Sequence, residues 1–162
     1  MKNSIIDEPL NFVIPVYENM PKDVDSFQDI KYNKKKEFDL LQGYKIAQEK
    51  QDISPLVSFE VYKEVSKDID KALVGKKFGN IIIKGKKTHF IDRVIGEYQE
   101  SDYKQQGKRQ GVKIGDIVEC LKNQNKSSRT NKDGSISLTY KSDKCKVTLN
   151  PDTGMLIQTN PI

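Results

Sequence analysis

The sequence predicts an α+β domain in which helices come first and an antiparallel sheet comes last. Between residues 55 and 123, apolar side chains recur about every 3.6 residues, which is typical of helices packed on a core. From residue 135 onward, apolar and polar side chains alternate, which is typical of half-buried strands. Because the helical period comes first and the strand period last, the order of elements is that of an α+β domain.

Composition limits the classes of protein to which the chain can belong. Its 162 residues suit one domain, or one domain with an appended segment, and 31% are charged. The net charge of +5 favours polyanionic partners such as nucleic acid. No apolar run approaches the roughly 18 residues of a membrane span, and Met1 to Glu8 does not resemble a signal peptide.

The cysteines and the histidine do not form a metal motif. Cys120 and Cys145 have no metal-ligand spacing, and His89 could complete a zinc site with them only with help from carboxylates. We expect both cysteines to be reduced and buried, with a disulfide as the less favoured alternative. The sequence therefore predicts neither a metal nor a cofactor.

Residues 1–52 read as a linker or a segment that precedes the domain, which then covers residues 53–162. Pro9, Pro15 and Pro21 interrupt the first part, and a short helix could begin near Glu37. The lysines of residues 31–36 are interpreted as solvated charge.

A long amphipathic helix is predicted between Ser54-Pro55 and Gly75, with the proline in its first turn. We expect it to pack on the domain's own sheet, although an interaction helix is an alternative. Asn80–Lys84, rich in β-branched residues, reads as a strand.

Thr88 to Gly96 is predicted to be a helix that carries the chemistry. His89 and Arg93 are four residues apart and would share a face, with Thr88 as N-cap and Gly96 as the stop. A group that titrates near neutral pH beside a permanent cation could move a proton and hold a phosphate. The alternative is a structural role, with His89 a polar residue near a helix start and Arg93 solvated or ion-paired.

The last third contains a loop, a helix and a meander. Gly107–Gly111 is a basic loop that could close over phosphates or be solvated. A second helix is predicted from Ile114 to about Asn123. Three strands are predicted at residues 135–140, 145–149 and 155–159, with turns between them.

These parts match the requirements of metal-independent RNA cleavage, in which the 2′-OH attacks the adjacent phosphate. His89 could act as base or acid, and Arg93 could bind the phosphate through its planar fork. A second acid or base is not evident; Lys87, Tyr140 or the substrate would have to serve. The remaining candidates are polar or basic side chains before the helix and on the sheet, which could contact the substrate: Lys86, Lys87, Ser137, Thr139, Tyr140 and Gln158.

Residues 89–96, 111–117 and 147–161 resemble the C-terminal ribonuclease modules of bacterial polymorphic toxins and phage-associated nucleases with the barnase, EndoU, colicin and RelE-like fold. The resemblance covers about residues 55–162. It implies two helices on a four-stranded antiparallel sheet, an RNA substrate that is often tRNA, and no metal. It also implies that residues 1–52 are a pre-toxin segment. His89 and Arg93 fit the helix roles of that group, and Thr159 is favoured for the strand hydroxyl, ahead of Thr139 and Ser137.

The resemblance also implies an immunity protein that blocks the active site. We expect an acidic one, because a cleft that binds RNA phosphates attracts Asp and Glu. Residues 11–21 resemble a segment near the end of glucosaminidase-type cell-wall hydrolase domains, so the module is expected to be secreted or delivered into a target bacterium as part of a larger protein.

Two other readings remain open. The chain could be a non-catalytic basic module that binds nucleic acid or a protein, although Tyr98, Tyr103 and Tyr140 are its only candidates for base stacking. It could also be an inactive relative that keeps the fold. Hydrolase chemistry of the Ser-His-Asp or Cys-His type is poorly supported, because the sequence has no Gly-x-Ser-x-Gly elbow.

Overall fold

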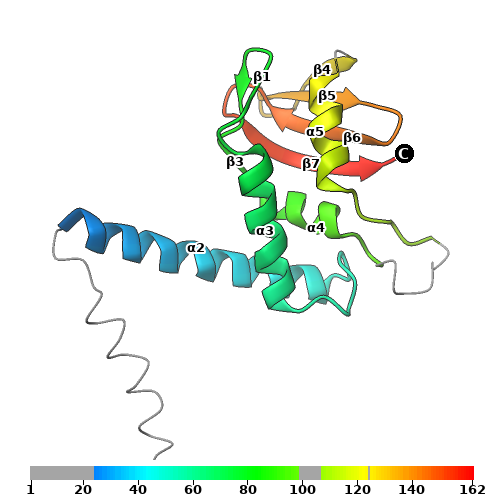
Figure 1. The fold of residues 1–162 in the computed structure, drawn as a ribbon. Coiled ribbons are helices and arrows are strands. Elements are labelled where there is room, and N and C mark those ends of the chain that lie inside the picture. The colour runs from blue at the N-terminus through cyan, green and yellow to red at the C-terminus, as the bar shows by residue number, and fades with distance from the viewer. Residues whose placement is uncertain (1–23, 99–106, 124) are drawn as a thin grey trace, which may run out of the picture. The chain divides into compact units, whose positions relative to one another are not determined.

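The computed structural model describes residues 24–98, 107–123 and 125–162 (Figure 1). The chain divides into two compact units, residues 1–39 and 40–162. Every candidate site residue belongs to the second unit, whereas the segment 11–21 lies outside the described residues. None of the helices in the described ranges has the length and apolar character needed to span a bilayer.

Helix α2 extends over Val24–Glu49, so the helix that the sequence placed near Glu37 begins earlier and is much longer than expected. The three early prolines all precede it, and its sequence is rich in Lys and Gln, which favour helix. Its last turns belong to the second unit, where Ala47 is fully buried and the Tyr44 ring packs against Phe59 and Tyr62. The compact unit therefore starts at Leu40, earlier than the expected boundary at residue 53.

The predicted amphipathic helix forms as α3 (Phe59–Leu73), but it begins later than expected. Its N-cap is Ser58, whose hydroxyl accepts from the Val61 N–H at 3.2 Å, so Ser54-Pro55 lies in the preceding turn. A two-stranded antiparallel hairpin follows, made of β1 (Lys77–Phe78) and β2 (Ile81–Ile82). The strand expected at residues 80–84 is the second arm of this hairpin.

The main sheet is mixed and has five strands, in the order β3-β7-β6-β5-β4. Its strands are β3 (Gly85–Lys86), β4 (Lys126–Thr130), β5 (Ile136–Lys141), β6 (Cys145–Asn150) and β7 (Met155–Pro161). Strands β4 to β7 pair antiparallel with one another, whereas β3 runs parallel to β7. The α+β class is thus confirmed, but a purely antiparallel four-stranded sheet is not what forms, because the short β3 adds to the edge of β7.

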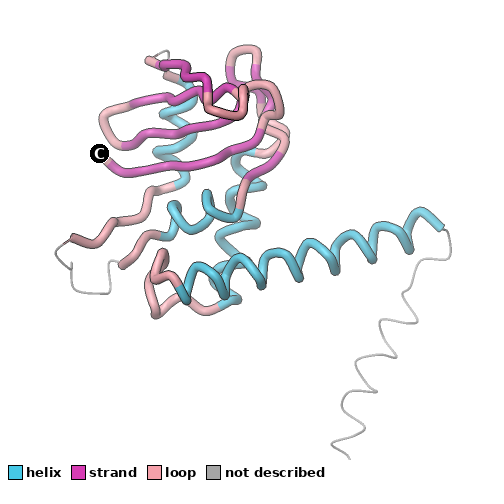
Figure 2. Tube along the Cα trace, turned by 180° about the vertical axis from the view of Figure 1, so that it is seen from behind, coloured by secondary structure: helices cyan, strands magenta, loops and turns pink. Residues whose placement is uncertain are grey.

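Helix α5 (Ile114–Lys122), which the periodicity predicted, covers one face of the sheet. The core-facing side chains of β6 and β7 include Val147, Leu149 and Leu156, all fully buried. Cys120 and Cys145 are free and buried in this layer, as expected. Figure 2 views the sheet from its other face, which no helix of the described residues covers. Helix α4 (Thr88–Ile95) runs beside β7.

Candidate functional site

Helix α4 is held at both ends by backbone contacts. It is preceded by Lys87, whose N–H donates to the Leu156 carbonyl of β7 at 2.9 Å. The expected N-cap, Thr88, is instead the first helical residue. Gly96 ends the helix as predicted, with φ 85° and its N–H on the Asp92 carbonyl at 2.9 Å. A Cβ at Gly96 would lie 2.2 Å from the Gly111 nitrogen, so this helix end accepts only glycine.

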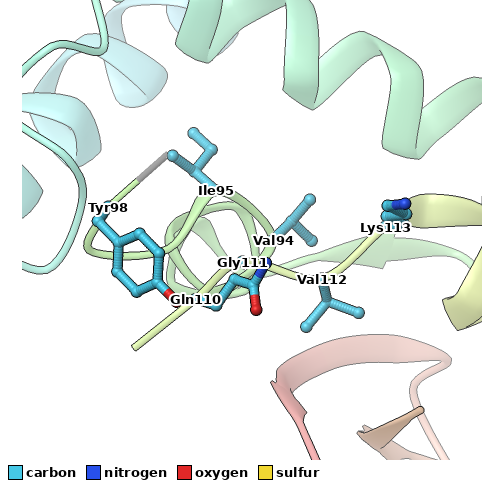
Figure 3. A pocket seen from close by; sticks show the side chains of 7 residues that line it. All are labelled: Val94, Ile95, Tyr98, Gln110, Gly111, Val112 and Lys113. Atoms are coloured by element: carbon cyan, nitrogen blue, oxygen red, sulfur yellow. The ribbon is translucent and has the colours of Figure 1, made fainter. Parts of the chain in front are cut away.

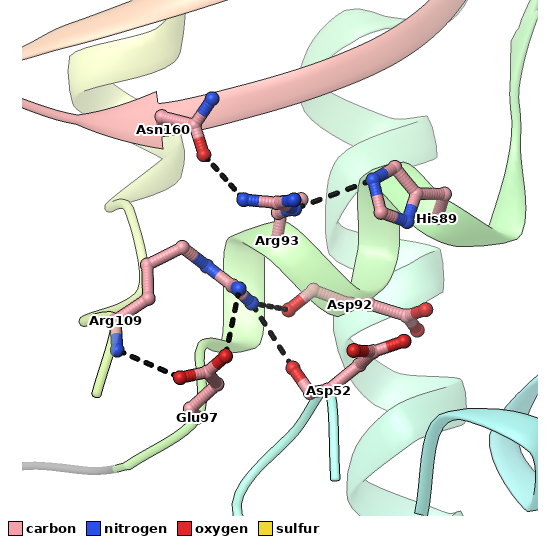
Figure 4. Close-up of polar contacts among 7 residues, drawn as sticks. All are labelled: Asp52, His89, Asp92, Arg93, Glu97, Arg109 and Asn160. Carbon is pink, nitrogen blue, oxygen red and sulfur yellow. Dashed lines mark hydrogen bonds and ion pairs between the residues drawn. The ribbon is translucent and has the colours of Figure 1, made fainter. Parts of the chain in front are cut away.

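His89 and Arg93 contact each other on one face of α4, as their spacing predicted. The Arg93 Nε donates to His89 Nε2 at 3.3 Å, and Arg93 Nη1 donates to Asn160 Oδ1 of β7 at 2.6 Å (Figure 4). The guanidinium is therefore fixed between the helix and the sheet edge. The sequence contains no signal for Asn160, because it lies 67 residues from Arg93 and a single asparagine forms no motif.

His89 is tuned toward its neutral form. Partial burial lowers its pKa below the ordinary value of 6.5, and the charge of Arg93 lowers it further. Asp52 acts in the opposite direction, as does a side-chain hydrogen bond with Gln158 of β7. With Nε2 accepting from Arg93, the ring proton resides on Nδ1 and Nε2 carries the lone pair. At neutral pH this imidazole is able to accept a proton.

Asp92, one turn along α4 from His89, anchors the helix in the core. This residue is 7% exposed and accepts from the Tyr62 hydroxyl of α3 at 2.8 Å. Burial raises the pKa of Asp92 to about 6, while the hydrogen bond from Tyr62 opposes that shift. Helix α4 is thus fixed to α3 through Asp92, beside the face that carries His89 and Arg93.

Arg109 holds the C-terminal end of α4. Its guanidinium donates to the backbone carbonyls of Asp52 at 3.0 Å and Asp92 at 3.3 Å, and it pairs with Glu97 at 3.4 Å (Figure 4). Burial lowers its pKa. The sequence placed this arginine in a loop that could close over a phosphate; in the structure its side chain is committed to these contacts.

The uncovered face of the sheet carries a row of polar side chains that leads to His89. Ser127, Thr139, Thr148 and Gln158 lie opposite one another on β4, β5, β6 and β7. The hydroxyls of Thr139 and Thr148 are 2.9 Å apart. The row lines a groove of about 420 Å³, to which Arg129, Ser137 and Ile157 also contribute. Of the predicted contacts, Ser137, Thr139 and Gln158 therefore belong to one surface.

Three other predicted residues lie elsewhere. Thr159 is 1% exposed, and its hydroxyl donates to the Lys146 carbonyl at 2.7 Å, so it is a core residue and not the strand hydroxyl of a site. Tyr140 is 3% exposed on the same core face and cannot meet a substrate on the open one. Lys86 pairs with Asp70 of α3. Lys87 is exposed just before α4 and remains a candidate.

A register irregularity explains why Gln158, and not Thr159, faces the open side of the sheet. The pairing of β6 with β7 shifts between Thr148 and Leu149, which leaves Ile157 as an extra residue on β7. Leu156 and Thr159 therefore face the core, and Gln158 turns outward. Strict alternation along residues 155–159 could not anticipate this bulge.

A second, smaller pocket of about 210 Å³ lies at the other end of α4 (Figure 3). It is formed by Val94, Ile95 and Tyr98 together with residues 110–113. Its lining is mainly apolar and includes Tyr98, which the sequence offered for base stacking, and the end of the basic loop at Gly111, but none of the predicted catalytic or substrate-binding residues. The described ranges also hold no cluster of three or more His, Cys, Asp or Glu side chains arranged for a metal ion.

The site is therefore a neutral histidine and a fixed arginine beside β7, next to an open sheet face lined with hydroxyls, an amide and cations. Such an arrangement can accept a proton and bind a phosphate. Comparison of the chain with protein-family models, with curated proteins and with solved structures finds no match.

Proposed function

We propose that this protein is a metal-independent RNA endonuclease that acts by attack of the ribose 2′-OH on the adjacent phosphate. The observation that carries the proposal is the contact of neutral His89 with Arg93 beside Gln158 and Asn160, at the end of the polar groove. Each of these groups has a role in that reaction.

An incoming phosphate would change the contacts of Arg93. The guanidinium now donates through Nε to His89, and a phosphate oxygen is a stronger acceptor than a neutral imidazole. A phosphate oxygen that takes over the Nε–H of Arg93 would release His89 Nε2 to accept the proton of the 2′-OH. Asn160 keeps the arginine in place, and the Gln158 amide is positioned to donate to a phosphate oxygen or to hold the imidazole.

The proton for the 5′-oxygen would come from His89 once it is protonated, or from a nearby cation such as Lys87, which is exposed at the start of α4. The first route requires that the 5′-oxygen, as well as the 2′-oxygen, comes within hydrogen-bond distance of His89. Attack by the 2′-OH and loss of the 5′-oxygen leave a 2′,3′-cyclic phosphate, and atoms and charge balance without an added ion.

The same face would suit an acidic protein inhibitor of the immunity type. Arg129, Lys141 and Lys146 are exposed on it, and Arg93 borders it. Association with an acidic partner there is expected to be fast and sensitive to salt. A partner that bound equally well at low and high salt, with a footprint away from these residues, would contradict this.

The test is incubation of the purified protein with bacterial RNA in excess EDTA. Wild type is expected to give discrete fragments with 2′,3′-cyclic phosphate ends, and His89→Ala to lose roughly 10²- to 10⁴-fold in rate. Arg93→Lys should also fail, because lysine cannot reproduce the fork. Thr159→Val is the matched control, since its hydroxyl lies in the core. Intact RNA with all four proteins would favour a non-catalytic binding module.

A further inference from the structure

The open sheet face carries a second polar row beside the one that ends at His89. Lys141 on β5, Lys146 on β6 and Asn160 on β7 lie opposite one another, and Asn160 holds Arg93. This row lies two residues along each strand from Thr139, Thr148 and Gln158, a separation of roughly 7 Å. A cationic row that ends at Arg93 thus runs beside a row of hydroxyls and an amide that ends at His89.

The two lysines are placed unfavourably for a surface with only a structural role. Lys141 and Lys146 face each other directly across neighbouring strands, where like charges repel. Both are exposed, and in the part of the chain that the structure describes neither makes an ion pair or a side-chain hydrogen bond. By contrast, Lys144, at the start of the same hairpin arm, reaches Asp116 at 3.8 Å. A bound anion would relieve the repulsion within the pair.

The pairs across the face contain no carboxylate. On β4, Ser127 faces Thr139 and Arg129 faces Ser137 of β5. The row of Thr139 continues through Thr148 to Gln158, and the row of Lys141 continues through Lys146 to Asn160. No aromatic side chain stands in either row, so the surface offers hydrogen bonds and positive charge but no platform for stacking bases. Its chemistry fits a sugar-phosphate backbone.

We propose that Lys141 and Lys146 form a phosphate-binding subsite for nucleotides next to the cleaved bond, so that a single RNA strand crosses the sheet from β7 toward β5. The inference rests on the proposed function, because Arg93 marks the scissile phosphate. Strands are about 5 Å apart, so the distance from Asn160 to Lys141 is roughly 10 Å, enough for one or two further phosphates. The substrate class is single-stranded RNA of at least three nucleotides, held by its backbone and not by its bases.

The test is binding of a fluorescent four-nucleotide RNA whose 2′-oxygens are methylated, so that it cannot be cut. Affinity is measured by anisotropy over a range of salt concentrations. The double variant K141Q/K146Q should bind about tenfold more weakly, and its slope of log K against log salt should fall by about 1.4, since each contact to a single-strand phosphate adds about 0.7. K67Q/K71Q removes the same charge from the exposed side of α3 and should match wild type.

Equal affinities and slopes for the two double variants would overturn the subsite. Cleavage of a dinucleotide, which has a single phosphate, tests the chemistry separately. Cleavage of the dinucleotide by wild type, together with equal binding by the two double variants, would leave the endonuclease standing and remove the subsite. Weaker binding by K141Q/K146Q without any cleavage would support the phosphate surface and remove the catalytic proposal.

Discussion

At the scale of single residues, the neutral state of His89 is the property on which the proposed chemistry depends. It arises from half-burial and from a permanent cation in contact with the ring. The contact with Arg93 helps to lower the pKa of His89 and also fixes the direction of the Nε2 lone pair. Arg93 therefore sets the protonation state and the orientation of the ring in the free protein.

We predict that His89 titrates below pH 6.5 in the folded protein. His89 is the only histidine, so its Cε1 proton gives an unambiguous NMR signal. Arg93→Gln should move the midpoint upward, because a nearby positive charge is lost, and Gln158→Ala should move it downward. A midpoint at or above 6.5 in wild type, or a downward shift in Arg93→Gln, would contradict this assignment.

The sign of the accompanying effect on stability follows from the same shift. Because the folded pKa lies below the unfolded one, His89 contributes stability above pH 6.5 that is lost as the pH falls through the folded pKa. The acid limb of the cleavage rate should coincide with the NMR midpoint, since the proposed base must be unprotonated.

At the scale of elements, α4 depends on the sharp turn that ends it. The carbonyls of Val94 and Ile95 and the backbone of residues 110–111 approach so closely that the crossing leaves no room for a side chain. The local pattern predicted the helix and its stop, because an apolar period and a following glycine are short-range signals. It did not predict β4, since a fully exposed edge strand has no apolar alternation.

Gly96→Ala is predicted to destabilise the fold by at least about 2 kcal/mol, through its positive φ and the clash with Gly111. Gly115 is the matched control: it lies in α5, and nothing lies within 4 Å of a Cβ added there. Gly115→Ala should stabilise by about 0.5–1 kcal/mol, because alanine is the better helix former. Urea unfolding of the two variants would show this, and equal midpoints would refute the close crossing.

At the scale of the whole molecule, the folding unit includes part of a helix that composition alone assigned to a linker. The Tyr44 hydroxyl donates to the Val57 carbonyl at 2.8 Å, and the Gln48 amide donates to the same oxygen at 3.0 Å. Together with buried Ala47, these contacts tie the end of α2 to the segment before α3. These contacts join residues 9 and 13 positions apart in the sequence. The charged and weakly patterned sequence of the helix gives no local signal that predicts them.

A fragment of residues 40–162 is therefore predicted to fold, whereas a fragment of residues 53–162 should be less stable by about 3 kcal/mol or more. The shorter fragment loses the aromatic packing of Tyr44 and four hydrogen bonds, one of them from Arg109 to the Asp52 carbonyl. Circular dichroism during urea unfolding measures the difference. Equal unfolding midpoints would mean that the end of α2 is dispensable.

The sequence by itself determined what depends on neighbours a few residues apart. His89 and Arg93 share a face because four residues nearly complete a helical turn, and β5 to β7 alternate because strands have a period of two. Only the tertiary structure decided which polar residues lie beside His89 and Arg93. The bulge at Ile157 turns Gln158 outward and Thr159 into the core, and the sheet brings Asn160 to Arg93. Strand register is a property of the assembled sheet, and a slip of one residue exchanges its two faces.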